Sequence, residues 1–237
     1  ATPSITGGTY SWAPGGATTQ TLTVSPGSTT TYTVTYTLNG CVGTGTGTVT
    51  VNPLPTVSST SQTICAGSSA TLTATPSITG GTYAWASGGQ TTQAITVSPA
   101  STTTYTVTYT LTGCTNTATG TVTVNPVPTV SVNSQTICAG ASTTLTATPS
   151  TTGGTYSWAP GGQTTATITI SPASTTTYTV TYTLAGCTNT GSGTITVNTI
   201  PTITVNSVNI CPGQNATLTA TGGTTYSWNT GATTNPI

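Results

Sequence analysis

The six cysteines are the residues of this chain with the most evident chemistry, and their spacing is regular. They form two series whose members lie 73 residues apart: Cys41, Cys114 and Cys187, and Cys65, Cys138 and Cys211. A zinc site would need four converging ligands, and the sequence has no His and no Cys-x-x-Cys pair. The cysteines therefore predict disulfide bonds, and with them an oxidising compartment.

Two sets of disulfide pairs are compatible with this spacing. In the first set each complete repeat closes on itself, through Cys65–Cys114 and Cys138–Cys187, and the partners of Cys41 and Cys211 lie outside this chain. In the second set each cysteine pairs with its neighbour in the sequence, as Cys41–Cys65, Cys114–Cys138 and Cys187–Cys211. Loop-closure entropy is about 4 kcal/mol for the long loop and about 3.5 kcal/mol for the short one, which does not decide between them. We favour the first set because each domain then holds its own cross-link, and unpaired structural thiols are the remaining alternative.

The chain contains no Lys, Arg, Asp, Glu or His. Proton transfer in enzymes depends mostly on these side chains, so neither a Ser–His–Asp triad nor a pair of catalytic carboxylates can form. A carboxylate cage for Ca²⁺ or Mg²⁺ is excluded for the same reason, and nucleic-acid binding lacks the cations that neutralise phosphates. We therefore predict a protein that is not an enzyme, takes no cofactor or metal and binds no nucleic acid. No apolar run reaches the ~20 residues needed to cross a bilayer, so membrane insertion is not expected.

A repeat of 73 residues organises the chain. Recurring sequence segments place a tryptophan at the same position of each copy. In the last copy three fewer residues precede the tryptophan. The predicted domains are a partial repeat at 1–53 that lacks its first strands, complete repeats at 54–126 and 127–199, and a partial repeat at 200–237 truncated after the tryptophan strand. The chain starts and stops inside a repeat and shows no signal peptide, so we expect a mature product or a piece of a longer array.

Within each repeat the apolar residues alternate with threonine. In the segment 32–38, Tyr-Thr-Val-Thr-Tyr-Thr-Leu, the apolar side chains share one parity and the threonines the other. Gly-Gly, Pro-Gly, Asn-Gly and Ser-Pro pairs interrupt such stretches as turns. The fold class predicted is all-β, a tandem array of small β-sandwiches, joined by the stiff linkers Asn-Pro-Leu-Pro at 52–55 and Asn-Pro-Val-Pro at 125–128.

The aromatic residues have a structural and a functional interpretation. The tryptophans share strand parity with a tyrosine two residues earlier, which favours burial in the core over sugar-stacking platforms. A second series of tyrosines is the candidate for a tyrosine corner. These core aromatics are Trp12, Trp85, Trp158, Trp228, Tyr32, Tyr105 and Tyr178. Asn215 begins the one Asn-x-Thr sequon that we single out as a candidate glycosylation site.

Sheet edges without lysine need another form of protection. Natural edge strands usually carry Lys, Pro or a bulge, and here the edges present Thr and Val. The edges are therefore expected to be occupied in an assembly or shielded by glycans. The partners predicted are neighbouring repeats of the same polypeptide and other copies, laterally or end to end, with surface glycans as a further candidate. Cohesion between uncharged surfaces should depend little on salt or on pH below the tyrosine range.

Several phrases of the second repeat resemble a known class of domain. They are Ile-Cys-Ala-Gly-Ser-Ser-Ala-Thr-Leu-Thr-Ala from Ile64, Thr-Tyr-Ala-Trp ending at Trp85, Thr-Tyr-Thr-Val-Thr-Tyr from Thr104, and Gly-Cys ending at Cys114. Together they resemble the tandem Ig-like and PKD-like repeats of bacterial surface adhesins and gliding-associated filament proteins, which are often exported by the type IX system. PKD repeats usually place an Asp-containing turn after the tryptophan, and this chain has uncharged turns there, such as 13–16 and 86–89, which argues against a metal role.

The composition, the repeat and the resemblance together predict a secreted or cell-surface structural protein. It would be a non-catalytic component of an extracellular bacterial filament or adhesin stalk. The alternative function is a glycan- or surface-binding module that uses exposed aromatics and threonine-rich loops.

Overall fold

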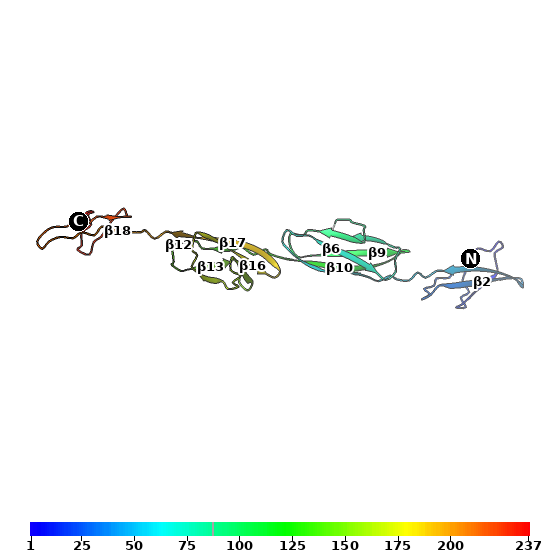
Figure 1. The fold of residues 1–237 in the computed structure, drawn as a ribbon. Helices are drawn as coiled ribbons and strands as arrows, with labels where there is room; N and C mark the ends of the chain where they lie inside the picture. The colour runs from blue at the N-terminus through cyan, green and yellow to red at the C-terminus, as the bar shows by residue number, and fades with distance from the viewer. Residues whose placement is uncertain (87) are drawn as a thin grey trace. The chain divides into compact units, whose positions relative to one another are not determined.

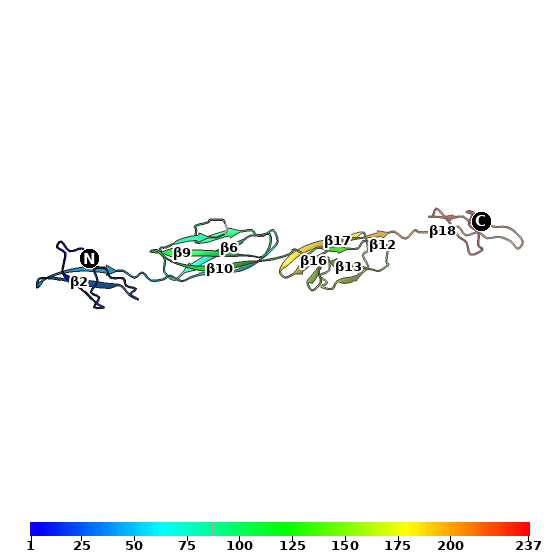
Figure 2. The same cartoon turned by 180° about the vertical axis from the view of Figure 1, so that it is seen from behind.

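The computed structural model describes residues 1–86 and 88–237, and its regular elements are all β-strands (Figure 1). The turn at 86–89 contains Ser87, which lies outside the described residues. The chain divides into two compact units, Ala1–Val124 and Asn125–Ile237. Figure 2 shows the same strands from behind. The predicted all-β fold class is confirmed.

The first part of unit 1 is a single antiparallel sheet. Its strand order is β1-β2-β3, with β1 at Thr9–Ala13, β2 at Thr30–Leu38 and β3 at Cys41–Val49. Every residue of β3 is exposed, although β3 pairs with β2 along its whole length. One face of this sheet therefore has no second layer over it.

The remainder of unit 1 is a two-layered sandwich. One sheet has the order β4-β6-β8, with β4 at Val57–Ser59, β6 at Ala70–Pro76 and β8 at Ala94–Val97. The other has the order β5-β10-β9-β7, with β5 at Gln62–Cys65, β7 at Thr82–Trp85, β9 at Thr103–Leu111 and β10 at Cys114–Asn125. The core lies between the sheets, where Leu72 of β6 and Ile95 of β8 cluster with Trp85, Val107 and Val122 of the facing strands.

Unit 2 begins with a sandwich of the same topology. The order β11-β13-β15 joins β11 at Val130–Val132, β13 at Thr143–Pro149 and β15 at Thr167–Ile170. The order β12-β17-β16-β14 joins β12 at Gln135–Cys138, β14 at Thr155–Ala159, β16 at Thr176–Leu184 and β17 at Cys187–Asn198. Strands β12 and β17 run parallel, whereas the other pairs of this sandwich are antiparallel. Leu145 and Ile168 of the first sheet pack on Trp158, Val180 and Ile195 of the second.

The last segment of unit 2 has little regular structure. Its two strands, β18 at Thr204–Val205 and β19 at Ala220–Thr221, form one short antiparallel ladder. Each of the sheets thus draws its strands from a single predicted repeat. The two compact units do not separate the four predicted repeats from one another, so that division of the chain stays a prediction.

The alternation of side chains explains why these segments are strands. In β9 the inward set includes Val107 and Tyr109, which are fully buried, and the outward set consists of threonines. Outward threonines meet across strands, as where the Thr104 and Thr121 hydroxyl groups lie 3.0 Å apart. Such cross-strand pairs contribute about 0.2–1 kcal/mol each. The strand β9 turns into β10 through Thr112 and Gly113, both with positive φ, which is the geometry that a two-residue hairpin requires.

Candidate functional site at the repeat junctions

Each linker between repeats is tied to the repeat that follows it. In unit 1 the side-chain amide of Asn52 donates to the carbonyl oxygen of Thr112 at 2.9 Å, and the Asn116 amide donates to the carbonyl oxygen of Pro55 at 3.0 Å. Thr112 belongs to the β9–β10 hairpin turn, so the linker is held by the tip of the hairpin and by its last strand. Pro55 is itself buried.

The second linker repeats this arrangement within unit 2. The side-chain amide of Asn125 donates to the carbonyl oxygen of Ala185 at 3.0 Å, and Ala185 occupies the same place in the β16–β17 hairpin turn, with φ 50°. Pro128, the second proline of this linker, is buried like Pro55. The stiffness expected from the prolines is therefore reinforced by hydrogen bonds. All of these bonds are neutral, so salt does not screen them.

The cysteines beside these linkers do not form the predicted pairs. Cys41, Cys114, Cys138 and Cys211 are free thiols, and Cys65 and Cys187 are disulfide-bonded. Each pair of both predicted sets contains at least one of the free thiols, so neither set is formed. Both predictions of connectivity are wrong for this structure.

The parallel pairing of β12 with β17 gives the physical reason why the first set, with its bonds inside each complete repeat, does not form. Cys138 lies opposite Asn198 at the end of β17, whereas Cys187 begins that strand of 12 residues. At about 3.3 Å per residue, the two cysteines are about 35 Å apart. A disulfide needs Cα atoms within about 7 Å of one another, so a bond within the repeat is excluded.

The cysteine that begins the second strand of each hairpin, Cys114 in β10 and Cys187 in β17, lies beside the linker. The Sγ atom of Cys114 lies 3.9 Å from the carbonyl oxygen of Asn52, and that of Cys187 lies 3.9 Å from the carbonyl oxygen of Asn125. Cys114 is partly exposed and Cys187 is buried. No group of three or more metal-ligating His, Cys, Asp or Glu residues occurs in the part of the chain that the structure describes.

The tyrosine corner is present, but other tyrosines make it. The Tyr109 hydroxyl donates to the carbonyl oxygen of Ile78 and accepts from the Gly81 N–H, both at 2.7 Å. Tyr182 bonds Thr151 and Gly154 in the same way, and Tyr36 bonds Ile5 and Gly8. The candidates Tyr32, Tyr105 and Tyr178 are buried core residues four positions earlier. The signal that could have found the corner is the Gly-Thr-Tyr phrase of the first three repeats, at 8–10, 81–83 and 154–156, which supplies a glycine where the corner ring approaches.

The glycine of each corner leaves no room for a side chain. A Cβ at Gly154 would overlap the carbonyl oxygen of Thr183 and lie 2.6 Å from the Tyr182 ring. A second tyrosine packs on the corner ring, since the Tyr83 and Tyr109 centroids are 5.0 Å apart with planes at 49°. Burial raises the pKa of the Tyr83 hydroxyl above its ordinary value of 10.0, and repulsion from an ionised Tyr109 raises this pKa further.

The tryptophans are core residues in the complete repeats. Trp85 and Trp158 are each 2% exposed, and their indole N–H groups donate to the carbonyl oxygens of Thr92 at 3.0 Å and Thr165 at 2.9 Å. Rings held in this way do not present a face to a sugar. Trp12 and Trp228 make equivalent bonds, to Thr19 and Thr234, but remain half-buried.

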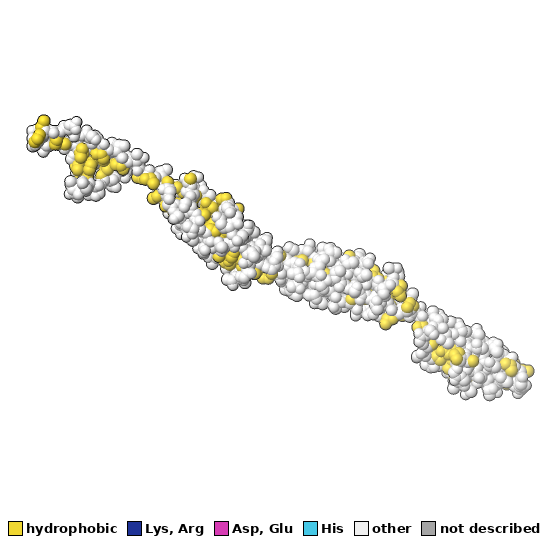
Figure 3. All heavy atoms as spheres, turned by 60° about the horizontal axis from the view of Figure 1, so that its bottom comes forward, with side chains coloured by type: hydrophobic (Ala, Val, Ile, Leu, Met, Phe, Trp, Pro, Cys, Tyr) yellow, Lys and Arg dark blue, Asp and Glu magenta, His cyan; other side chains and the backbone are white. Residues whose placement is uncertain are grey.

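No side chain on the surface is charged. Figure 3 shows polar and backbone atoms over most of the visible face, with hydrophobic side chains in separate patches. Asn215 of the sequon is exposed. In residues 1–86 and 88–237 no helix is long and apolar enough to pass through a bilayer.

Comparisons with known proteins find similar folds but no relative in sequence. No protein-family model matches the chain, and no curated protein matches it. Among solved structures, extracellular domains 3–5 of Drosophila OTK cover 72% of this chain over 71% of their own length, with 14% identity and a TM-score of 0.42. An I-band fragment of titin covers 80% of this chain over 87% of its own length, with 13% identity and a TM-score of 0.46. Because these TM-scores are low, the Ig-like assignment rests on the facing sheets of this chain itself. The chain is a tandem array of Ig-like β-sandwiches.

Proposed function

We propose that this chain is a structural segment of an extracellular bacterial filament or adhesin stalk, and that its role is mechanical rather than catalytic. The observation that carries the proposal is the tie between each linker and the next hairpin turn, made by Asn52 in one unit and Asn125 in the other. Hydrogen bonds of this kind at successive linkers restrict the bending of each linker, which a protein with a mechanical role requires. The bacterial setting is proposed on the resemblance to adhesin and gliding-filament repeats.

The chemistry of the chain supports the same proposal. It has no charged side chain to activate a nucleophile or transfer a proton. The disulfide bonding of Cys65 and Cys187 favours an oxidising location, outside the cytoplasm or at the cell surface. Burial of Trp85 and Trp158 argues against the alternative of a glycan-binding module in the complete repeats.

Small-angle X-ray scattering of the chain tests the role of the linker ties. We expect a narrow distribution of particle lengths for the natural sequence and a broader one for the double variant Asn52→Ala, Asn125→Ala. Asn215→Ala is the matched control, because Asn215 is exposed and lies away from both linkers. If the double variant and the control scatter alike, the ties do not limit motion and the proposal loses its main support. Electron microscopy of native material that shows compact single particles instead of thin fibres would also contradict it.

A further inference from the structure

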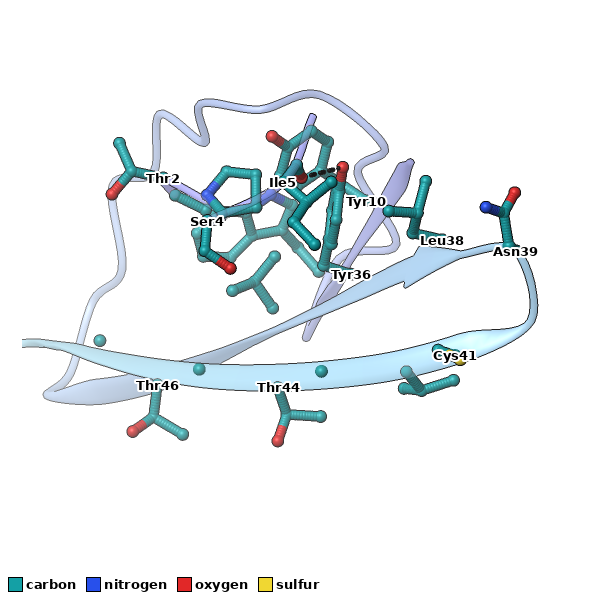
Figure 4. Close-up of a pocket in the computed structure, with 18 residues that line it drawn as sticks. Thr2, Ser4, Ile5, Tyr10, Tyr36, Leu38, Asn39, Cys41, Thr44 and Thr46 are labelled. Atoms are coloured by element: carbon teal, nitrogen blue, oxygen red, sulfur yellow. Dashed lines mark hydrogen bonds between the residues drawn. The ribbon is translucent and has the colours of Figure 1, made fainter. Parts of the chain in front are cut away.

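The end strands β8 and β15 of the two complete sandwiches carry backbone groups that pair with no strand. A strand directs its side chains to the two faces of its sheet, as on β3, where Thr44 and Thr46 point to one side and Tyr36 lies on the other (Figure 4). Its N–H and C=O groups point sideways, toward the neighbouring strands. Among the described residues, β8 has a neighbour only in β6, and β15 only in β13. The open side of each strand can therefore accept a further strand.

The ladder between β6 and β8 shows which groups of β8 are free. The Ala74 N–H donates to the carbonyl oxygen of Gln93 at 2.9 Å, and the same register continues to the pair of Leu72 with Ile95. In an antiparallel ladder such hydrogen-bonded pairs alternate with pairs whose N–H and C=O groups point away from each other. Thr96 follows Ile95 directly. Its N–H and C=O groups therefore point to the open side of the sheet.

The strand β15 has the same arrangement. The Ala147 N–H donates to the carbonyl oxygen of Ala166 at 2.8 Å, in register with the pairing of β13 with β15. The same alternation directs the N–H and C=O groups of Thr169 to the open side. Thr96 and Thr169 lie 73 residues apart, so both complete repeats present one edge of the same kind.

The end strands β7 and β14 of the facing sheets differ, because a turn covers them. The Trp85 N–H donates to the carbonyl oxygen of Gln90, and the Trp158 N–H to that of Gln163, both at 2.9 Å. These bonds occupy the open side of each strand. Strands β8 and β15 are four residues long and contain neither Lys nor Pro, which are the usual means of protecting an edge. Their edges are open to pairing.

The side chains of the two edge strands suit the addition of a strand. Ile95 and Ile168 point into the core and are each 4% exposed. Val97 and Ile170, two residues later, are half-buried and pack against the core from the edge. The threonines between them are exposed on the outer face. An added strand with the same alternation would place apolar side chains inward and threonines outward, as inside the sandwich.

We propose that β8, and likewise β15, pairs antiparallel with the same strand of a second copy of this chain, so that two sheets join into one. The pair is symmetrical about a twofold axis at Thr96, and the N–H group of each Thr96 donates to the carbonyl oxygen of the other. On the inner face, Val97 of one copy lies opposite Ile95 of the other. The corresponding residues of β15 are Thr169, Ile170 and Ile168.

A second copy is the occupant because the edge is complementary to itself. Around a twofold axis the donors of one strand meet the acceptors of an identical strand. The chain has no charged side chain, so two copies approach without repulsion, and a net charge near zero favours association. A charged partner would bury its charges against neutral groups without compensation. The inference goes beyond the proposed mechanical role of one chain, because it adds a lateral contact between chains.

Sedimentation of the whole chain over a range of concentrations tests the contact. We expect the natural chain to associate, and the double variant Thr96→Pro, Thr169→Pro to associate about ten- to a hundredfold more weakly. Each proline removes an outward N–H group and leaves the ladder within its own sheet intact. Thr96→Val, Thr169→Val is the matched control, because it keeps both N–H groups and the branched side-chain shape. A natural chain that stays monomeric, or equal weakening in the two double variants, overturns the proposal.

Opposite charges test the symmetry of the contact. With β15 blocked by Thr169→Pro, the variants Thr96→Lys and Thr96→Glu should each be monomeric at low salt, because the twofold axis places like charges opposite each other. Their equimolar mixture should form dimers that salt weakens, which also shows that both variants fold. A mixture that associates no better than either variant alone contradicts the pairing.

Hydrogen exchange measured by NMR locates the contact. On association the Thr96 and Thr169 amides should exchange at least tenfold more slowly, whereas the amide of Val57, on the opposite edge strand β4, should not change. Protection of Val57 in place of Thr96 overturns the proposal. If the chain is monomeric but a peptide with the sequence of residues 92–98 protects Thr96, the second copy is the wrong occupant. The linker ties are tested by scattering at concentrations where the chain is monomeric, so the two proposals fail separately.

Discussion

Replacing Tyr182 with Phe removes one hydroxyl group and two hydrogen bonds. The hydroxyl donates to the carbonyl oxygen of Thr151 at 2.7 Å and accepts from the Gly154 N–H at 2.8 Å, and the residue is fully buried. A hydrogen bond contributes about 1 kcal/mol net, and a buried group left without a partner costs about 1–3 kcal/mol. We therefore expect the Tyr182→Phe variant to destabilise its sandwich by about 2–3 kcal/mol.

The chain provides two controls for this measurement. Tyr178→Phe changes the same atom type in the same strand, and the structure records no hydrogen bond of the Tyr178 hydroxyl in the fully described stretch 127–199, so a loss below about 0.5 kcal/mol is expected. The sandwich of 54–126 keeps its own corner at Tyr109 and should be unchanged in either variant.

Hydrogen exchange measured by mass spectrometry can separate the two sandwiches. Peptides from β14 and β16 of the Tyr182→Phe variant should exchange about 30- to 150-fold faster, which is the expected free energy expressed as a ratio. The corresponding calorimetric transition should fall by roughly 10–20 °C, given about 4–8 °C per kcal/mol for a domain of this size. Equal losses of stability in Tyr182→Phe and Tyr178→Phe would refute the argument, because the two hydrogen bonds of the Tyr182 hydroxyl would then make no contribution to stability.

Three further predictions concern packing and pH. Gly154→Ala should destabilise its sandwich by more than about 2 kcal/mol in urea unfolding, because the added methyl group meets a backbone oxygen and the corner ring, whereas Gly43→Ala should be tolerated since nothing lies within 4 Å of it. Leu145→Ala should cost about 2–5 kcal/mol and Leu54→Ala, at a position 65% exposed, less than about 0.5 kcal/mol; similar values for the two would contradict the assigned core. Stability should be constant from about pH 5 to 7.5 and fall above about pH 10, because folded Tyr83, with its raised pKa, keeps a proton that the unfolded chain releases; urea midpoints that rise above pH 10 would show the opposite sign.

The strands and the core were predictable because they depend on local alternation. Tyr105 and Val107 are two residues apart, so the sequence predicts that they lie on the same face of the strand, and in the structure both belong to the core. The 73-residue repeat places the same alternation in the other sandwich. The tyrosine corner was assigned to the wrong residue because Tyr105 and Tyr109 have the same parity. Only the path of the loop that brings Ile78 and Gly81 to the Tyr109 hydroxyl distinguishes them.

The cysteine pairs could not be derived from spacing. Whether Cys138 can reach Cys187 depends on the strand direction of β12, and a sequence pattern does not distinguish parallel from antiparallel neighbours. The strand direction of β12 is a property of tertiary structure, and local sequence carries little information about it. Trp12 differs in this respect: it was predicted as a core residue and is only half-buried, because the partial repeat at 1–53 has no sheet facing its strand, whereas the strand of Trp85 has one.

The parallel alignment of β12 and β17 has a consequence for a chain under tension. These strands lie near the entry and the exit of their sandwich, so pulling its two ends apart drives one strand to slide along the other. All the hydrogen bonds of that ladder then resist together in shear, instead of opening one after another as in a zipper. A fibre made of such sandwiches should rupture at high force and, because every group involved is neutral, at the same force in fresh water and in brine.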